Sequence, residues 1–281
     1  MQFRFAVLLL LVAGAAGELK SQSKQAQVLE RLGRGASFEQ KKEWKEAEAE
    51  YRPALALDPG SASLHFDLAY VLARQGKVDD AIAEFRESLR LDPTSAVAHQ
   101  NLGAALHRKG DFDGAIAECR ESLRLKPEYA EAHSNLGAAL KSKSDMDGAI
   151  AEYRKAICLK PDLATAHYNL ANALRAKHDL EGAEQEFGAA LSLEPDNTAA
   201  QIGLGNALLA KGDLSGAISQ FHKALDSNPD YAPAHYNLGV ALETGRDLKA
   251  AFQEYRTAYQ LDPHDPAIRS GYRRVSQLLD P

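Results

Sequence analysis

The sequence predicts an all-α chain of seven 34-residue helix–turn–helix repeats that stack as an α-solenoid, followed by a C-terminal capping helix. Three observations predict this fold class. Ala and Leu dominate the composition while the strand-forming Val, Ile and Thr are scarce, which favours helix. Apolar residues fall three or four apart in two runs per period, as on two amphipathic helices. Prolines recur every 34 residues, at Pro59, Pro93, Pro127, Pro161, Pro195, Pro229 and Pro263.

The first seventeen residues, MQFRFAVLLLLVAGAAG, are typical of a secretory signal peptide. Arg4 gives a positive start, an apolar run follows, and small residues predict cleavage after Ala15 or Gly17. The apolar run is shorter than the roughly 20 residues that a membrane-spanning helix needs. We therefore expect an exported protein, periplasmic or secreted, with no membrane contact after cleavage. Residues 18–27 are expected to form a polar lead-in to the repeats.

The repeats align as seven units with three recurring packing columns. The units cover residues 28–61, 62–95, 96–129, 130–163, 164–197, 198–231 and 232–265. The eighth place is always Gly or Ala and the twentieth is always Ala, so the two helices of a unit can approach closely. A large residue usually fills the twenty-fourth place, where the units carry Tyr51, Phe85, Cys119, Tyr153, Phe187, Phe221 and Tyr255.

Turn residues separate the predicted helices. Gly76, Gly110 and Gly212 suit the left-handed conformation that ends a helix, and the repeating proline ends the second helix of each unit. A single hairpin of this length cannot bury its apolar face, whereas stacked hairpins form a continuous core.

The two ends depart from the pattern. In the first unit Arg34 replaces Leu and Pro53 lies inside the second helix, where proline costs about 3 kcal/mol, so we expect this unit to be frayed or kinked. At the other end, residues 266–281 predict a capping helix with Asp265 as its N-cap and Pro266 as its first residue. Its apolar stripe comprises Ile268, Tyr272, Val275 and Leu279, and Arg269, Arg273 and Arg274 are expected to face water.

Taken together, the period, the small residues at places eight and twenty, the aromatic at twenty-four and the proline at thirty-two resemble the tetratricopeptide repeat (TPR) family over residues 28–265. This resemblance implies a right-handed superhelix. It also implies a concave groove, lined mainly by the first helix of each unit, that binds peptides or proteins.

The segment AHSNLGAAL at residues 132–140 raises the question of a catalytic His and Ser. Ser134 points about 100° away from His133 on a helix, and the other units with a histidine carry no serine beside it. Equivalent helices lie roughly 10 Å apart, too far for two histidines to share a metal. We therefore predict no catalytic residue, no metal site and no cofactor. The fourth-place histidines, His65, His99, His133, His167 and His235, are expected to pack between helices.

The two cysteines, Cys119 and Cys158, lie about five places out of register on neighbouring helices. A disulfide requires Cα atoms within about 7 Å, so we predict no bridge between them. Both are expected to be small core residues.

The sixth place carries Asn101, Asn135, Asn169 and Asn237, with Asp67 in the second unit and Gly203 in the sixth. Asn is a mediocre helix former, and its amide both donates and accepts hydrogen bonds. The row is similar to the asparagine ladder in the TPR superhelix of O-linked N-acetylglucosamine transferases, which implies pairing with a peptide backbone. The alternative is that each Asn bonds within or between neighbouring helices.

Other first-helix places predict the remaining groove surface. They supply Phe66, Tyr70, Tyr168, Ile202 and Tyr236 as apolar or aromatic surface, with Asn172 and Asn206 beside them. A basic row of Arg74, Arg108, Lys141 and Arg175 either meets a carboxylate or complements helix C-termini. TPR proteins that bind chaperone tails use a Lys at the fifth place, and no unit here has one, which disfavours that ligand class.

We therefore expect a non-enzymatic scaffold that binds a protein or an extended peptide. The net charge of −6 gives no basic surface for nucleic acid. The alternative is an accessory or targeting subunit of an envelope enzyme or assembly complex, resembling the TPR arm of a glycosyltransferase without its catalytic domain. A purely structural assembly subunit is a third hypothesis, and the repeats predict no particular oligomeric state.

Overall fold

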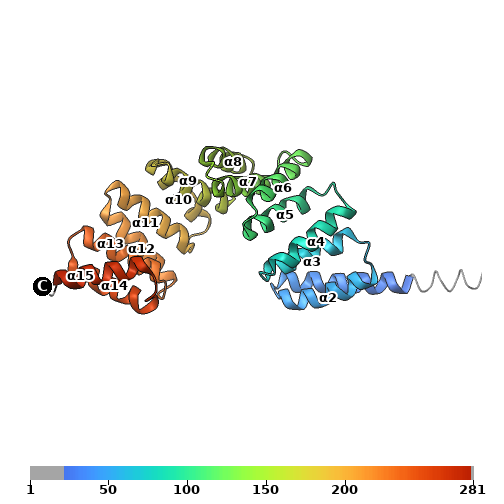
Figure 1. Ribbon diagram of the computed structural model, residues 1–281, viewed down its shortest axis with the longest axis horizontal. Coiled ribbons are helices and arrows are strands. Elements are labelled where there is room, and N and C mark those ends of the chain that lie inside the picture. The colour runs from blue at the N-terminus through green and yellow to red at the C-terminus, as the bar shows by residue number, and fades with distance from the viewer. Residues whose placement is uncertain (1–21, 280–281) are drawn as a thin grey trace, which may run out of the picture. The chain divides into compact units, whose positions relative to one another are not determined.

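A computed structural model describes residues 22–279, all of whose regular structure is helical (Figure 1). The expected signal peptide at residues 1–17 lies outside the described residues. The chain divides into two compact units, one ending at Ala139 and the other beginning at Leu140. The described part of the chain contains no helix that is both long and apolar enough to cross a membrane.

The first compact unit begins with the blue helices of Figure 1 and ends within the green helix α7. A first helix covers residues 22–40, so residues 22–27 of the expected polar lead-in are helical and exposed. It is followed by α2 (Trp44–Leu57), α3 (Ala62–Arg74), α4 (Val78–Leu91), α5 (Ala96–Lys109) and α6 (Phe112–Leu125), with the boundary to the second unit inside α7 (Ala130–Ser142).

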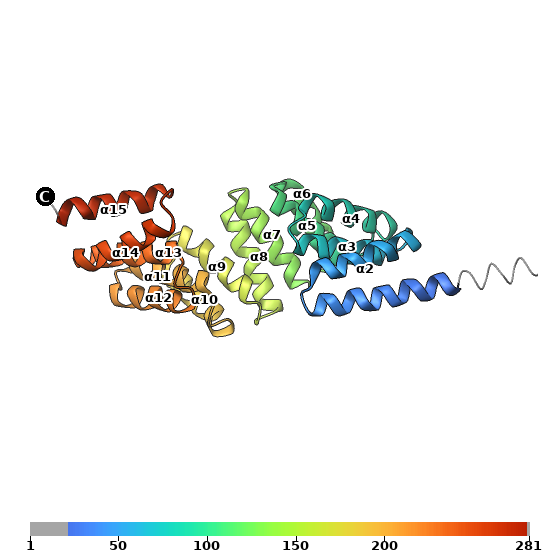
Figure 2. The same cartoon turned by 90° about the horizontal axis from the view of Figure 1, so that it is seen from below.

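The second compact unit continues the same alternation. Its helices are α8 (Met146–Leu159), α9 (Ala164–Ala176), α10 (Leu180–Leu193), α11 (Thr198–Lys211), α12 (Leu214–Ser227), α13 (Ala232–Thr244), α14 (Leu248–Leu261) and α15 (Pro266–Leu279). Consecutive helices pack on each other from α2 to α6 and from α8 to α15 (Figure 2). The alternate helices α9, α11, α13 and α15 also touch in sequence, as α3 and α5 do in the first unit. These contacts confirm the predicted α-solenoid of helix pairs.

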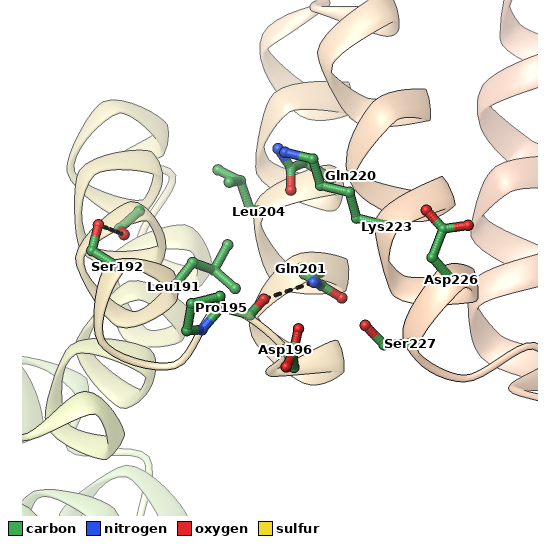
Figure 3. A pocket seen from close by; sticks show the side chains of 11 residues that line it. Leu191, Ser192, Pro195, Asp196, Gln201, Leu204, Gln220, Lys223, Asp226 and Ser227 are labelled. Carbon is green, nitrogen blue, oxygen red and sulfur yellow. Dashed lines mark hydrogen bonds between the residues drawn. The ribbon is translucent and has the colours of Figure 1, made fainter.

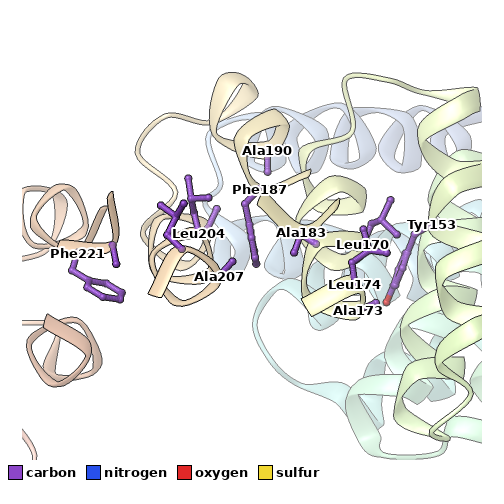
Figure 4. Packing of buried hydrophobic residues seen from close by; sticks show 14 of the residues in the cluster. Tyr153, Leu170, Ala173, Leu174, Ala183, Phe187, Ala190, Leu204, Ala207 and Phe221 are labelled. Carbon is purple, nitrogen blue, oxygen red and sulfur yellow. The ribbon is translucent and has the colours of Figure 1, made fainter. Parts of the chain in front are cut away.

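A buried side chain at the twenty-fourth place, aromatic in six units and Cys119 in the third, joins the helices of each pair. All seven of these side chains are at most 1 % exposed. A Cβ added at Gly205 would lie 2.5 Å from the ring of Phe221, so the ring packs directly on the glycine backbone. Figure 4 shows this arrangement in the second unit, where Tyr153, Phe187 and Phe221 alternate with small alanines and leucines. The small residues therefore set the close approach that the aromatic rings require.

Each turn between the two helices of a repeat contains one residue with a left-handed backbone. The predicted glycines, Gly76, Gly110 and Gly212, adopt φ values of 81°, 89° and 88°, which confirms them. The other four units use a residue with a side chain at the same place: Lys42, Ser144, His178 and Arg246, with φ of 60° to 66°. The backbone geometry of the turn is thus constant although glycine is not.

We expected the first unit to be frayed or kinked, and the part of this expectation that concerns fraying was wrong. Helix α2 continues through Pro53 and ends at Leu57. Tyr51 and Ala54, on either side of the proline, are buried at 1 % and 0 % exposure and hold the helix against its neighbours. Arg34, the other departure, pairs with Glu50 at 3.2 Å. Core packing and this ion pair offset the hydrogen bond that the proline removes.

The two cysteines are free and lie in different environments. Cys119 is fully buried, and burial raises the pKa of its thiol to about 12. Cys158 is exposed, so the prediction that both are core residues was wrong for this one. It lies five places after the aromatic column, which turns it away from the neighbouring helices.

Helix α15 covers the C-terminal end of the repeats as predicted. Asp265 Oδ1 accepts from the backbone nitrogens of Ala267 and Ile268 at 2.8 and 2.9 Å, which makes Asp265 the N-cap. Ile268 and Val275 are buried. Arg269, Arg273 and Arg274 are exposed, as predicted. Arg274 also forms a bidentate ion pair with Glu243 of α13, at 2.8 and 2.6 Å, which fixes α15 to that helix.

The left-handed turn predicts opposite effects for two matched substitutions. His178→Gly removes the crowding of Cβ at φ 62° and is expected to stabilise the protein by up to about 1 kcal/mol, since the flexibility of glycine in the unfolded chain offsets part of the gain. Gly76→Ala is expected to destabilise by about 1 kcal/mol through the backbone alone, because no atom lies within 4 Å of an added Cβ. Urea unfolding measures both, and shifts of the same sign would contradict the argument.

Candidate functional site

The candidate binding surface is the exposed side of the first helices, which we call the first-helix face. In the first compact unit it comprises Phe66, Tyr70 and Arg74 on α3, Asn101 and Arg108 on α5, and Asn135 on α7. In the second it comprises Lys141 at the end of α7, Tyr168, Asn169, Asn172 and Arg175 on α9, Asn206 on α11, and Tyr236 and Asn237 on α13. The contacts of α9 with α11 and of α11 with α13 bring the residues of the second unit onto neighbouring helices.

Two of the asparagines on this face are already engaged in hydrogen bonds. Asn101 Nδ2 donates to the Val97 carbonyl at 2.9 Å and to Gln100 Oε1 at 3.0 Å. Asn172 Nδ2 donates to the Tyr168 carbonyl at 3.0 Å, and its Oδ1 accepts from Arg175 at 3.4 Å. The local hydrogen-bonding alternative therefore describes these two residues.

The other four asparagines are half-buried and make no hydrogen bond within the described residues: Asn135, Asn169, Asn206 and Asn237. Each retains two N–H donors and a carbonyl acceptor. A half-buried amide without a partner in the protein is available to a ligand that lies along the helices.

Gly203 interrupts the asparagine row for a packing reason. A Cβ at this position would lie 2.4 Å from the ring of Phe187. The Phe187 ring occupies the space that a side chain would need, so a larger residue at this place would have to displace the ring. The position of this ring therefore accompanies the gap in the row.

The aromatic residues of the face serve the core as well as the surface. Phe66, Tyr168 and Tyr236 pack on the buried aromatics of their own units, Phe85, Phe187 and Tyr255, with ring centroids 5.7, 6.0 and 5.7 Å apart. Tyr70 packs edge-on against Trp44 at 6.3 Å. Each is half-buried, so one side of the ring stabilises the helix pair and the other side contributes apolar surface.

Most of the basic row has partners inside the protein. Arg108 Nη1 donates to the Ala73 carbonyl at 2.7 Å, at the C-terminal end of α3, and so complements that helix end. The Arg74 guanidinium lies 5.0 Å from the centre of the Trp44 ring. Arg175 donates to Asn172. Lys141 makes no ion pair within residues 22–279. Arg108 therefore complements a helix C-terminus, which was one of the two expected roles of the basic row. The charge of Lys141 remains available to a ligand.

The fourth-place histidines act as structural links. In four units Nε2 lies 2.8–3.2 Å from the carbonyl of the preceding proline, and Nδ1 lies 2.6–2.7 Å from a Glu on the second helix. His133 Nε2 makes the same proline contact at 3.0 Å. Sequence reasoning missed these glutamates, which are Glu84, Glu118, Glu186 and Glu254. Each follows its histidine by nineteen residues, and this constant spacing is a signal that identifies them.

Sequence reasoning also missed a pocket of about 550 Å³ between the fifth and sixth repeats, beside Gln201, which replaces the histidine in the sixth (Figure 3). Elsewhere, no group of three or more His, Cys, Asp or Glu within residues 22–279 is placed to hold a metal ion.

Asp67 takes the place of the sixth-place Asn in the second unit, and its environment disfavours its charge. Burial raises the pKa of its carboxyl from 3.8 to about 6, and the nearby Glu39 carboxylate adds to the increase. The native state therefore holds this proton at pH values where the unfolded chain has released it. Stability contributed by the neutral carboxyl is lost as the pH rises from 3.8 through about 6.

Asp67→Asn is expected to stabilise the protein above pH 6 by roughly 1–2 kcal/mol, after discounting the full shift for partial solvent screening. The gain should shrink as the pH falls and should vanish below 3.8, where Asp67 is protonated in both states. Chemical unfolding of both proteins across this range measures the difference, with the exposed Asp230→Asn as a control. A gain that does not vary with pH would contradict the assignment.

Comparison with known proteins places these repeats in a family. Models described as "Tetratricopeptide repeat" match residues 32–96, 84–117, 168–232 and 203–266. A model described as "TPR repeat" matches residues 105–144 and 139–177. No curated protein matches this sequence at a significant level.

Solved structures share the fold at low sequence identity. The APC/C hetero-tetramer Cut9–Hcn1 has a TM-score of 0.76 and 17% identity, over 86% of this chain and 48% of that chain, so the present chain spans about half of that relative. The structure of pilF from Pseudomonas aeruginosa has a TM-score of 0.64 and 20% identity, over 74% and 94% of the two chains. YrrB has a TM-score of 0.57 and 22% identity, over 67% and 97%. With the family models matching most of its length, the chain belongs to the tetratricopeptide repeat family.

Proposed function

We propose that this protein is a non-enzymatic scaffold that holds an extended peptide or a segment of a partner protein along the first-helix face of its second compact unit. The observation that carries the proposal is the set of half-buried asparagine amides in that unit without hydrogen-bond partners in the described residues: Asn169, Asn206 and Asn237. Tetratricopeptide repeat proteins bind protein or peptide partners, and the proposal assigns that role to these amides.

A side-chain amide is suited to an extended peptide because the peptide backbone offers the same donors and acceptors whatever its side chains are. In the second compact unit, Asn169, Asn206 and Asn237 lie on the adjoining helices α9, α11 and α13. The exposed sides of Tyr168 and Tyr236 provide apolar contact beside two of these amides. Recognition would therefore combine backbone hydrogen bonds with a few aromatic contacts for specificity.

The names of similar proteins are compatible with this role but do not carry it. YrrB is described as a TPR protein with an unusual peptide-binding site, and PilW as a type IV pilus biogenesis factor. At 22% and 19% identity these likenesses concern the fold. The proposal therefore rests on the amides of this chain.

We also propose that the protein works outside the cytoplasm, because residues 1–17 have the charge, apolar run and small residues of a signal peptide. Expression of the full gene followed by mass measurement of the exported product should give a chain that begins at Ala16 or Glu18. A product that retains Met1 within the cell would contradict export.

Replacement of the free amides is expected to weaken peptide binding without changing helicity. Asn169→Ala and Asn237→Ala should each reduce affinity by roughly threefold to tenfold, since one intermolecular hydrogen bond contributes about 0.5–1.5 kcal/mol. The ligand would be a peptide selected from a random library on the unmodified protein, and affinity would be measured by fluorescence anisotropy.

The matched control is Asn172→Ala on the same helix as Asn169, because its amide is already bonded to Tyr168 and Arg175. This variant should retain most of the affinity. Equal losses for Asn169 and Asn172, or no loss for either, would overturn the assignment of the free amides.

A further inference from the structure

The pocket of about 550 Å³ between the fifth and sixth repeats is formed by α10, the beginning of α11 and α12, all within the second compact unit (Figure 3). Its walls come mainly from second helices, whereas the amides of the proposed peptide site lie on first helices. The pocket is therefore a separate site, and its chemistry does not depend on the proposed function.

Three departures from the repeat pattern meet at this pocket. Gly188 stands at a place where five of the other units carry an arginine: Arg52, Arg86, Arg120, Arg154 and Arg256. An added Cβ at Gly188 would meet no atom within 4 Å, so the space beside it is open. In addition, Gln201 replaces the fourth-place histidine and Gln220 replaces its glutamate partner.

Gln201 leaves a buried acceptor without a donor. The side chain is 4 % exposed, and its Nε2 donates to the Pro195 carbonyl at 2.9 Å. Because a carbonyl only accepts, the nitrogen must face Pro195 and the oxygen must face away from it. In Figure 3 this Oε1 points toward the side of the pocket where Ser227 lies, and it is buried with no hydrogen-bond partner. The equivalent histidine of the fifth repeat, His167, meets Glu186 at 2.6 Å instead.

The pocket adds two carboxylates to this acceptor. Asp196 and Asp226 line it, are exposed, and form no ion pair within residues 22–279. Lys223 is the cation among the lining residues, and in Figure 3 it extends toward Gln220 and away from Asp226. Leu191 and Leu204 supply apolar surface. One end of the pocket therefore presents mainly hydrogen-bond acceptors beside an apolar wall.

We propose that this pocket binds a guanidinium group, carried either by an arginine side chain of a partner polypeptide or by free arginine. A guanidinium has five N–H donors and no acceptor, so it can donate to Gln201 Oε1 and to the carboxylates of Asp196 and Asp226 together. Its alkyl chain can pack on Leu191 and Leu204. An ammonium is a compact and strongly hydrated charge and fits a set of separated acceptors less well.

The test is calorimetric titration of the purified protein with N-acetyl-L-arginine methylamide and with the matching lysine derivative. The arginine compound should bind saturably, and the lysine compound about tenfold more weakly, as expected for the loss of one hydrogen bond to a charged group. Absence of saturable arginine binding, or equal binding of the two compounds, would overturn the proposal.

Two variants locate the site. Gln201→His restores the residue that five other units carry and should reduce arginine binding by about tenfold or more, because it removes the acceptor. Gly188→Leu fills the open space from a different helix and should do the same. Thermal unfolding checks that both variants fold. Asn169→Ala, in the proposed peptide site, should leave arginine binding unchanged. If both pocket variants bind arginine as tightly as the unmodified protein, the guanidinium binds elsewhere and the proposal is wrong.

Lys223→Gln distinguishes the two sources of the group. If the natural ligand is an arginine side chain within a polypeptide, removal of this cation should strengthen binding of the blocked derivative. If the natural ligand is free arginine, its carboxylate can pair with Lys223, and the protein should bind free arginine more tightly than the blocked derivative. Lys223→Gln should then weaken the binding of free arginine. Lack of change in both measurements would contradict binding in this pocket.

Discussion

The repeats depend on one contact, in which a large buried side chain packs on a small residue of the partner helix. The ring of Phe221 lies where a Cβ of Gly205 would stand, and the same relation holds between Tyr255 and Gly239. The contact brings two helices close enough to exclude water from both, and burial of an aromatic side chain is among the largest single contributions to a core. Because a hairpin of this size cannot bury that ring alone, the contact also requires the next repeat.

The packing of large residues on small ones explains which other positions of the repeat can vary. Once the small and large places fix the helix pair, the fourth, sixth and twenty-fifth places can change without loss of the fold. Gly203 is an exception, since the ring of Phe187 reaches across the repeat boundary and occupies the space that a side chain would need. Gln201 keeps the hydrogen bond to the proline carbonyl that the histidines of other repeats make, here to Pro195. Substitutions at single places of the repeat therefore change the polar groups at one site and leave the helix packing unchanged.

The repeat period predicted the structural features that depend on residue spacing alone. Contacts with neighbouring residues determined the other features. The helix pairs, the glycine turns and the N-cap at Asp265 follow from the positions of residues along the chain. The continuation of α2 through Pro53 does not, because it depends on the burial of Tyr51 and Ala54. Likewise Asn101 and Asn169 share one column, and each has a backbone carbonyl four residues earlier, but only Asn101 has a neighbouring Gln100 whose oxygen accepts from its amide. Side-chain partners of this kind depend on the three-dimensional surroundings of each residue, which its place in the repeat does not specify.

The two candidate sites make different demands on a partner, and electrostatics favours the same kind of partner for both. The proposed peptide site uses neutral amides that would bond to a peptide backbone, so it would carry little preference for sequence. The proposed guanidinium site adds carboxylates to an unpaired acceptor and would thus favour a cation. A net charge of −6 attracts cationic segments from a distance and accelerates their encounter with the protein. An arginine-containing segment would satisfy the long-range field and the pocket, while its backbone could still be read by the asparagines.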